Sequence, residues 1–375
     1  MIASHYSQHR NAILEKPLQN DDDGKLRLGS SRAYSLSLSP KLLFTRSNVL
    51  PALVSSRVHE QLEFLAVGTW WIYQSRPREE SKGTEPTADL DQLPGILRKI
   101  PGSREDIFAD QSLPLRAQRS IIKLLKLAAD PEEHVKVIQK HGVLPFSTFL
   151  SNEHRIPIDL QPLIHALTLS PDPPPKTSTG FALTNIHRHL TSIGLFGPGF
   201  SSVIPKWGGL SEIAQVGCRA GAVGGGVYVL GKTIRDVEKT HGVGKKEVDS
   251  RTGGQGQENE PSLVVKLDAG EAIRTKWLIG TPDDLPDPTA TTTHSRYTSY
   301  TVSIIASPLS DLFPPPSENS PPPAASVVVF PSGVLRLESS DEEPESAPVY
   351  ITVHSADSGE CPVDQSKLIP LSQHD

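Results

Sequence analysis

An acid, an amide and a base recur at helical spacing within residues 208–231, which read GGLSEIAQVGCRAGAVGGGVYVLG. Glu212, Gln215 and Arg219 stand at positions i, i+3 and i+7, which fall on one face of an α-helix. Opposite charges on an exposed face can form charge-assisted hydrogen bonds with a partner protein, although an ordinary solvated surface helix has the same pattern. This polar face is suited to contact with water or with a partner, and the pattern alone does not indicate a reaction.

The other reactive side chains form no catalytic or metal-binding motif. His187 and His189 make an H-x-H pair, but no carboxylate or cysteine stands at ligand spacing in that helix. The acidic pairs at 283–284 and 342–343 lie in polar or Pro-rich stretches, where there is little burial to shift a carboxyl pKa. The glycines at 224–226 follow a helix and precede a strand, the reverse of the order in a nucleotide-binding loop. We therefore predict no catalytic residue, no cofactor and no metal ion.

Composition restricts the class of protein. The 375 residues carry 37 Lys and Arg against 43 Asp and Glu, a net charge of -6, which gives no basic footprint for nucleic acid. Two cysteines, Cys218 and Cys361, are too few for a disulfide framework and favour a reducing compartment. No apolar run reaches the roughly 18 residues of a membrane span, and the N-terminus has no signal-peptide core. A cytoplasmic protein is expected.

The elements around the charged stripe follow from local signals. Ser211 suits an N-cap, which would start a helix at residue 211 or 212 and put Glu212 near the positive end of the helix dipole. Residues 224–226 would end the helix by permitting positive φ, and 227–230 would continue as a strand. The helix face expected to pack against a core consists of Ile213, Val216, Ala220 and Val223.

The whole chain predicts a mixed α/β (α+β) protein with an inserted all-α domain. Residues 1–100 would form the first part of an α/β domain, 101–197 a helical domain, and 198–375 the second part of the α/β domain. In the helical domain Asp130 and Asp159 are expected N-caps. Pro-rich or polar insertions, expected to be loops or disorder, lie near 253–260, 281–294 and 314–325. Strands are expected at 62–73, 262–270, 275–281, 297–307, 325–330, 333–338 and 348–355.

Three stretches carry a family resemblance. Residues 212–230 resemble the signature of the Rab escort proteins and Rab GDP-dissociation inhibitors, in which a Glu, a Gln three residues on and an Arg seven on precede a double glycine and an aromatic. Residues 31–73, with an Arg and an aromatic at their start, resemble the family's other signature. Residues 100–127 resemble the start of its helical domain, and their Pro-Gly-Ser-Arg-x-Asp-x-Phe pattern is closer to the escort proteins. The resemblance covers most of residues 28–235.

This resemblance implies a fold and a role. The fold would be the flavin-monooxygenase-like fold of the GDP-dissociation inhibitors, without a flavin. The role would be that of a Rab escort protein, an accessory subunit without catalysis, which binds a GDP-bound Rab GTPase and presents it to the Rab geranylgeranyltransferase heterodimer for C-terminal prenylation. Delivery of the prenylated Rab to membranes implies a cytoplasmic protein with transient membrane association and no nucleic acid partner.

The resemblance also assigns residues. Those that would bind the Rab are Arg32, Glu212, Gln215, Arg219, Tyr228 and Val229. The helical domain would shelter the geranylgeranyl lipid of the Rab, whose burial is worth about 0.8 kcal/mol per CH₂. Ordinary core packing is the commoner role for each side chain proposed to line the lipid site, namely Leu124, Leu125, Leu127 and Ile138.

Two departures and three alternatives stand beside this interpretation. The family's first strand, with its glycine-rich turn, has no counterpart here, so we expect an N-terminally incomplete α/β domain, and Leu195 stands where the family has an Arg. The alternatives are a GDP-dissociation inhibitor that recycles prenylated Rabs, a fragment of a flavin-dependent oxidoreductase, and an inactive fragment.

Overall fold

The chain divides into two compact units. Unit 1 comprises Met1–Gln19 and Gly221–Ser295, and unit 2 comprises Asn20–Ala220 and Arg296–Asp375. Within the described ranges, no helix combines the length and the apolarity needed to span a lipid bilayer. The computed structural model describes residues 29–37, 41–75, 95–101, 104–110, 113–240, 262–280, 285, 297–316, 320–335 and 347–374.

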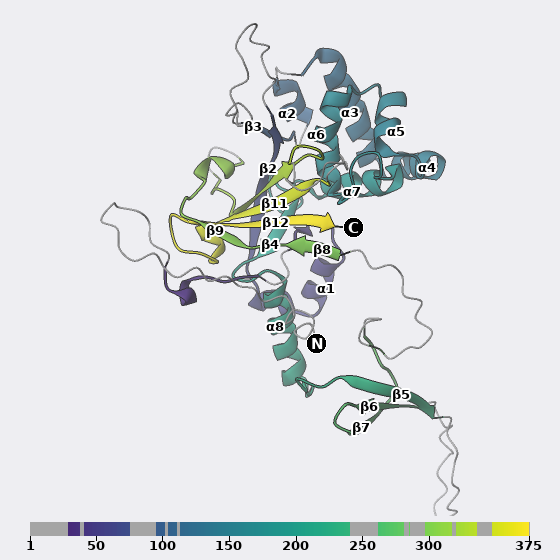
Figure 1. Ribbon diagram of the computed structural model, residues 1–375, viewed down its shortest axis with the longest axis vertical. Coiled ribbons are helices and arrows are strands. Elements are labelled where there is room, and N and C mark those ends of the chain that lie inside the picture. The colour runs from purple at the N-terminus through teal and green to yellow at the C-terminus, as the bar shows by residue number, and fades with distance from the viewer. Residues whose placement is uncertain are drawn as a thin grey trace, which may run out of the picture. The chain divides into compact units, whose positions relative to one another are not determined.

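Unit 2 is built on a nine-stranded mixed sheet (Figure 1). The strand order is β1-β4-β2-β10-β11-β12-β8, with β3 beside β2 and β9 beside β12. β2 and β10 pair in parallel, and each of the other described pairs in this sheet is antiparallel. The strands are β1 (Leu43–Phe44), β2 (Phe64–Gln74), β3 (Ile96–Lys99), β4 (Ser202–Pro205), β8 (Tyr297–Tyr300), β9 (Ser303–Ile305), β10 (Ala325–Phe330), β11 (Val349–Ser355) and β12 (Ser366–His374).

The strands form where β-branched and aromatic residues concentrate. Val327 of β10 lies opposite Trp70 of β2 and is fully buried. The strands at the centre of the sheet are therefore rich in apolar residues. Expected strands at 62–73, 262–270, 297–307, 325–330 and 348–355 are confirmed.

Two expected strands are wrong. Residues 276–280 lie outside any strand because β7 ends at Thr275. Residues 332–334 form a turn, so 333–335 are not a strand, and 336–338 of the second expected strand lie outside the described residues. Hydrophobic runs form strands only where a neighbouring strand accepts their backbone hydrogen bonds, and propensity alone does not supply that neighbour. β12, with fewer strand-forming residues, was not expected, although it pairs with β11 along six residue positions.

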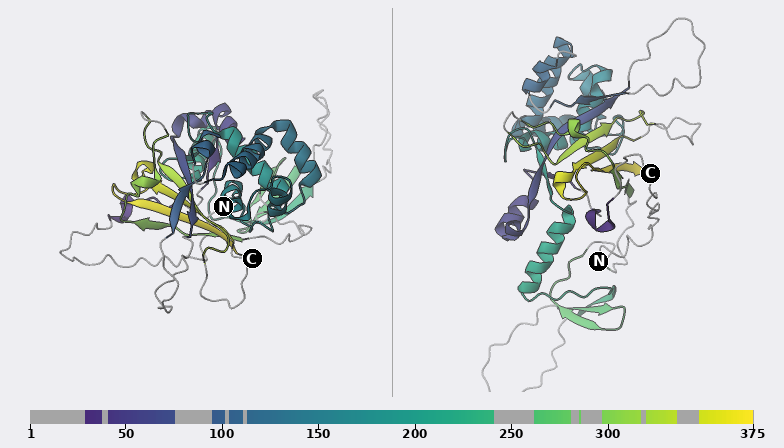
Figure 2. Two further views of the ribbon diagram at one scale, coloured as in Figure 1. Left: turned by 90° about the horizontal axis from the view of Figure 1, so that it is seen from above. Right: turned by 90° about the vertical axis from the view of Figure 1, so that its left-hand side faces the viewer.

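Six helices of unit 2 gather into one block beside the sheet (Figures 1 and 2). They are α2 (Arg104–Ala109), α3 (Leu115–Ala129), α4 (Pro131–His141), α5 (Phe146–Asn152), α6 (Gln161–His165) and α7 (Thr179–Ser192), and a further helix, α1 (Val49–Ser55), lies outside the block. The block and the sheet share one hydrophobic cluster, and burying each of its large aliphatic side chains contributes about 2 kcal/mol. Members from the strands and helices include Val67, Trp70, Ile72, Val327, Ile121, Leu124, Phe146, Leu183 and Ile186.

Of the two expected N-caps, one explains where a helix of this block starts. The Asp130 carboxylate accepts hydrogen bonds from the amides of Glu132 and Glu133 at 2.9 and 3.0 Å, which confirms it as the N-cap of α4. These amide hydrogen bonds also hold the pKa of Asp130 below its usual value. Asp159 caps no helix: it lies inside a 3₁₀ turn, Ile158–Leu160, before α6, so that expectation is wrong.

The described part of unit 1 contains a three-stranded antiparallel sheet in the order β5-β6-β7. Its strands are β5 (Ile234–Thr240), β6 (Ser262–Leu267) and β7 (Ala272–Thr275). Gly270 closes the β6–β7 turn with a φ of +92°, a conformation that favours glycine. Val265 of β6 is buried, and Lys266 of the same strand forms ion pairs with Asp236 and Glu238 of β5.

The predicted domain boundaries remain predictions. All six helices of the block fall within the expected range 101–197. Both ends of that range lie inside unit 2, so the division into two units does not test them. The insertion at 253–260 lies outside the described residues, as does 281–294 apart from Leu285. Within 314–325 the described residues 314–316 and 320–324 form loop, and Pro323 and Ala324 are buried. The Pro323 ring lies so close to Gly68 of β2 that a Cβ there would clash with it.

Candidate partner-binding surface

The charged stripe lies on α8, which spans Leu210–Val223. The helix begins one residue before the expected start, and Ser211 is not its N-cap. The Ser211 hydroxyl donates to the carbonyl of Gly208, and the amide of Glu212 donates to the carbonyl of Gly209 at 3.2 Å. The backbone thus closes the first turn by itself, which leaves Glu212 in that turn as expected.

The apolar face of α8 holds only the first half of the helix against a core. Ile213 and Val216 pack against a small cluster formed by β1, α1 and β4. Ala220 and Val223, which were expected on the same packed face, are exposed, and Val223 is 86% exposed. The second half of the helix therefore projects beyond this cluster, so its one charged residue, Arg219, can be reached by a partner.

The polar face of α8 carries charges that unit 2 does not neutralise. Glu212 is half-buried, Gln215 and Arg219 are exposed, and the Gln215 amide lies 3.5 Å from Glu212 Oε1. Neither Glu212 nor Arg219 forms an ion pair with another described residue. At 1.5 Å per residue, the seven residues from Glu212 to Arg219 span about 10 Å along the helix. An acid and a base at this separation suit a protein surface better than a small ion.

Glycines end α8 in a Schellman motif. The amide of Gly226 donates to the carbonyl of Gly221 at 2.8 Å, and the amide of Gly225 donates to Ala222 at 3.0 Å. Gly225 takes a φ of +88°, as a residue at this position of the motif must. The expected glycine stop is confirmed.

The segment after this turn, residues 227–230, is not a strand, contrary to expectation. It carries Tyr228 and Val229, whose side chains are about half exposed. The Tyr228 hydroxyl lies against Gly221, where a Cβ would clash with it. Val227 and Leu230 are almost wholly exposed, so the segment offers apolar side chains for a partner to cover.

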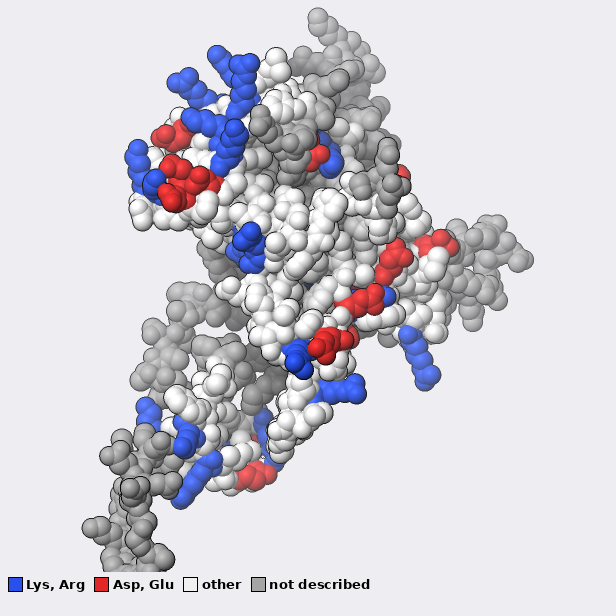
Figure 3. Space-filling view, turned by 180° about the vertical axis from the view of Figure 1, so that it is seen from behind, with Lys and Arg blue, Asp and Glu red and all other residues white. Residues whose placement is uncertain are grey.

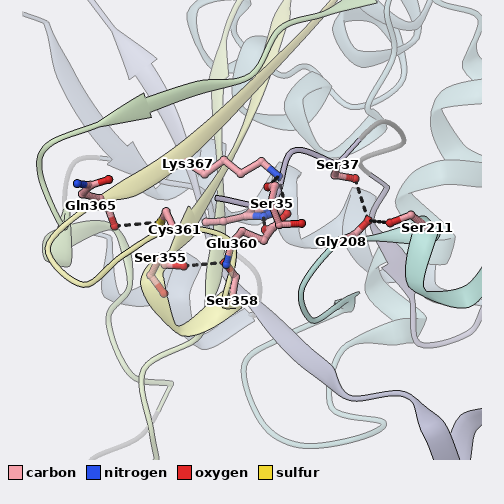
Figure 4. Close-up of polar contacts among 11 residues, drawn as sticks. Ser35, Ser37, Gly208, Ser211, Ser355, Ser358, Glu360, Cys361, Gln365 and Lys367 are labelled. Carbon is pink, nitrogen blue, oxygen red and sulfur yellow. Dashed lines mark hydrogen bonds and ion pairs between the residues drawn. The ribbon is translucent and has the colours of Figure 1, made fainter. Parts of the chain in front are cut away.

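Arg32 lies in a 3₁₀ turn, Ser31–Ala33, and is exposed with no ion-pair partner among the described residues. The structure joins this segment to the start of α8, because the Ser37 hydroxyl donates to the Gly208 carbonyl at 3.2 Å (Figure 4). Arg32, Glu212, Gln215 and Arg219 belong to unit 2, and Tyr228 and Val229 belong to unit 1.

The candidate lipid-binding side chains belong to the core of the helical block. Leu124 is fully buried in the large hydrophobic cluster, and Leu125, Leu127 and Ile138 pack against that cluster from its edge. Two cavities among the described residues, one against β2 and one beside β3, include none of these four side chains in their walls. Lipid binding at these four residues would require α3 and α4 to separate.

A second charged surface, which was not singled out from the sequence, lies on α3. Arg116, Arg119, Lys123 and Lys126 stand at i, i+3, i+7 and i+10, and all four are exposed. None has an acidic partner among the residues that the structure describes. Figure 3 shows Lys and Arg side chains gathered over the helical block. The spacing alone would have shown this stripe in the sequence.

A cavity of about 1000 Å³ lies within unit 2 against β2 and the end of α7. Trp70 and His189 contribute to its walls, together with prolines from the 314–323 stretch. Burial lowers the pKa of His189 to about 4, so its imidazole is neutral at pH 7. His187 Nδ1 donates a hydrogen bond to the carbonyl of Ala128 at 2.8 Å. Across the described ranges no three His, Cys, Asp or Glu side chains gather as metal ligands.

Comparison with known proteins identifies a family and several relatives. The family profile "GDI: GDP dissociation inhibitor" matches residues 11–258. Over 206 residues the chain is 31% identical to the Rab proteins geranylgeranyltransferase component A of Saccharomyces cerevisiae, covering 55% of this chain and 30% of that protein. Over 239 residues it is 26% identical to component A 2 of Mus musculus, covering 63% of this chain and 35% of that protein. The chain thus spans about a third of the length of these curated relatives.

A solved structure shares the fold. The Rab GDI of Plasmodium falciparum matches with a TM-score of 0.60 and 16% identity, over 92% of this chain and 69% of that one. The mixed α/β fold expected from the sequence is therefore confirmed.

Proposed function

The chain belongs to the GDP dissociation inhibitor family, and on that basis we propose that it acts as a Rab escort protein. In this proposal it binds a Rab GTPase in the GDP form, presents it to the Rab geranylgeranyltransferase heterodimer for C-terminal prenylation, and delivers the product to membranes. The names of its relatives, component A of that transferase, support the assignment. The protein then contributes binding and no bond-making chemistry, and works in the cytoplasm with transient membrane contacts.

The observation that carries this proposal is the exposed stripe of α8. Glu212 and Arg219 keep their charges without an ion pair to another described residue, and Arg32 does the same on the adjoining segment. Reciprocal charges on a partner would fix its orientation and favour one conformation of its surface, since charge complementarity acts mainly on specificity. Tyr228 and Val229 would add apolar contact area to the Rab.

We also propose that the helical block takes the geranylgeranyl chain of the prenylated Rab. The candidate residues remain Leu124, Leu125, Leu127 and Ile138. The geranylgeranyl group would enter between α3 and α4 and replace their contacts with each other. Burial of the lipid, at about 0.8 kcal/mol per CH₂, would offset the cost of opening this core. A photoreactive geranylgeranyl group on the Rab should then crosslink to α3 or α4, and crosslinks confined to other elements would rule this site out.

Titration of the protein with an unprenylated Rab tests the main proposal. We expect the GDP-loaded Rab to bind at least about tenfold more tightly than the same Rab carrying a non-hydrolysable GTP analogue, a difference of roughly 1.4 kcal/mol. The GDP complex should also bind the transferase heterodimer in gel filtration. Absence of Rab binding in both nucleotide states would refute the proposal. Strong preference for prenylated Rab, without transferase binding, would identify a recycling inhibitor instead, and flavin absorbance bands would indicate an oxidoreductase.

A further inference from the structure

Three segments far apart in the sequence meet beside the start of α8. They are residues 29–37, which carry Arg32, residues 206–211, which lead into α8, and residues 354–367, which run from the end of β11 to the start of β12. Figure 4 shows the polar contacts at this junction. No described β-ladder includes residues 29–37, so their position depends on these contacts.

A buried group of three ionisable side chains lies at the centre of the junction. Lys367 is 0% exposed, Glu360 is 1% exposed and His354 is 5% exposed. One carboxylate oxygen of Glu360 accepts a hydrogen bond from Lys367 Nζ, and the other contacts His354 Nδ1. Burial would raise the pKa of the Glu360 carboxyl, but its hydrogen bonds and the neighbouring charges hold the pKa below its ordinary value. Glu360 is therefore ionised and paired.

This group holds the segment that carries Arg32 by its backbone. The amide of Ser35 donates to the backbone carbonyl of Glu360 at 3.0 Å. The carbonyl of Ser35 accepts from Lys367 Nζ, also at 3.0 Å. The Lys367 ammonium thus joins the buried acid to a backbone position three residues after Arg32, and both backbone polar groups of Ser35 are satisfied.

The same junction holds the start of α8. The hydroxyls of Ser37 and Ser211 both donate to the carbonyl of Gly208. The amide of Trp207 donates to the carbonyl of Ser358 at 3.0 Å, in the turn that leads to Glu360. Contacts therefore run from the buried acid to the segment of Arg32 on one side and to the first turn of α8 on the other.

A contribution to stability alone does not explain why charges are buried here. Replacing a buried ion pair by apolar residues of similar volume is often neutral or stabilising, because desolvation of the charges offsets their attraction. Apolar residues could not, however, satisfy the backbone carbonyl of an irregular segment such as residues 29–37. What the charges add is the fixed position of that segment.

We propose that Lys367, Glu360 and His354 form a positioning unit that fixes Arg32 relative to the first turn of α8. The unit sets the spacing of the charges that a partner meets, without touching the partner. The identity of that partner as a GDP-bound Rab rests on the proposed function, whereas the fixed spacing does not.

The test replaces the ion pair by apolar residues, Glu360→Leu with Lys367→Met. In the free protein we expect hydrogen exchange of residues 29–37 and 206–211 to accelerate about tenfold or more, because the hydrogen bond to the Ser35 carbonyl is lost. The matched control is Arg98→Met with Asp110→Leu, which removes a part-buried ion pair elsewhere in unit 2 and should leave both segments unchanged. Exchange that is unchanged in the first variant, or equal in both, overturns the proposal.

A double-mutant cycle separates positioning from a general effect on stability. Arg32→Ala should weaken binding of a GDP-loaded Rab about tenfold in the parent protein. Once the buried pair is removed, the same substitution should weaken binding less than about twofold, because a displaced Arg32 no longer contributes to the affinity. Equal losses in both backgrounds would overturn the proposal. If the parent binds no Rab, the proposed function fails and the exchange experiment still decides the positioning unit. If the double variant does not fold, Ser37→Ala removes the link to Gly208 and should accelerate exchange of both segments, and unchanged exchange overturns the proposal.

Discussion

Replacing Glu212 and Arg219 together by alanine should remove most Rab binding and leave the stability of the protein almost unchanged. Arg219 is exposed, Glu212 is half-buried, and neither forms an ion pair with another described residue. Surface substitutions of this kind change the free energy of unfolding by about 0.5 kcal/mol or less. Alanine is also the best helix former, so α8 itself should persist.

The expected loss of binding is much larger than that. Truncating one member of a desolvated, hydrogen-bonded charge pair at an interface costs about 2 to 5 kcal/mol. At about 1.4 kcal/mol per factor of ten, this corresponds to a loss of affinity of ~30-fold to ~4000-fold for each pair that the partner completes. The size of the effect depends on how completely the bound partner excludes water from around these charges.

The assay is a titration with fluorescent GDP-loaded Rab, combined with thermal unfolding of each variant. The matched control is Glu132→Ala with Lys140→Ala on α4, which also removes one exposed acid and one exposed base and leaves the net charge unchanged. Unaltered affinity in the α8 variant, or a loss no greater than in the α4 control, would refute the reasoning. A large drop in melting temperature would show that the two side chains act in folding and not in recognition.

Three further predictions concern the stability of unit 2. Burial lowers the pKa of His165 and His189 to about 4 from 6.5, so the unfolded chain takes up protons first and the free energy of unfolding should fall between about pH 6.5 and pH 4, by ~2 kcal/mol per histidine at pH 5; equal urea midpoints at pH 7 and pH 5 would contradict this. Ser178 accepts the amide of the third residue of α7, so Ser178→Ala should cost about 1 kcal/mol and Ser178→Gly only a few tenths in the same urea assay. Gly68→Ala places a Cβ 2.2 Å from a proline ring and should lower the free energy of unfolding by about 1 to 3 kcal/mol. Gly217→Ala has open space around it and should stabilise α8 by up to about 1 kcal/mol. A melting temperature that moves in the same direction in both variants would contradict the close contact between Pro323 and Gly68.

Local signals predicted the parts of the fold that short stretches of chain decide. The i, i+3, i+7 spacing located α8, glycines located its end, and Asp130 located the start of α4, since each depends on hydrogen bonds within a few residues. The strand expected at residues 227–230 failed for the opposite reason. Its Val, Tyr and Leu side chains favour extended backbone, but no neighbouring strand pairs with them among the described residues.

The candidate site was predictable only in its exposed members. Arg32, Glu212 and Arg219 were found through spacing and family resemblance, and the structure places them on two segments joined at Gly208. The residues that join those segments were not predictable, because Lys367 and Ser35 are 332 positions apart and neither belongs to a motif. The sequence shows which residues carry charge, and only the fold shows which charges are buried together.

The exposed charges and the buried charges around α8 differ in whether they are paired within the protein. Those at the surface, including Arg219, are left without ion pairs among the described residues, so a partner that supplies the missing charges gains the full interaction. Those inside, Glu360 and Lys367, are paired with each other and with backbone, because an unpaired buried charge would cost several kcal/mol. A surface of unpaired charges discriminates between partners only if its spacing is fixed, and a segment without a β-ladder cannot fix its own. The buried pair supplies that constraint, so the selectivity of the exposed charges depends on residues that no partner touches.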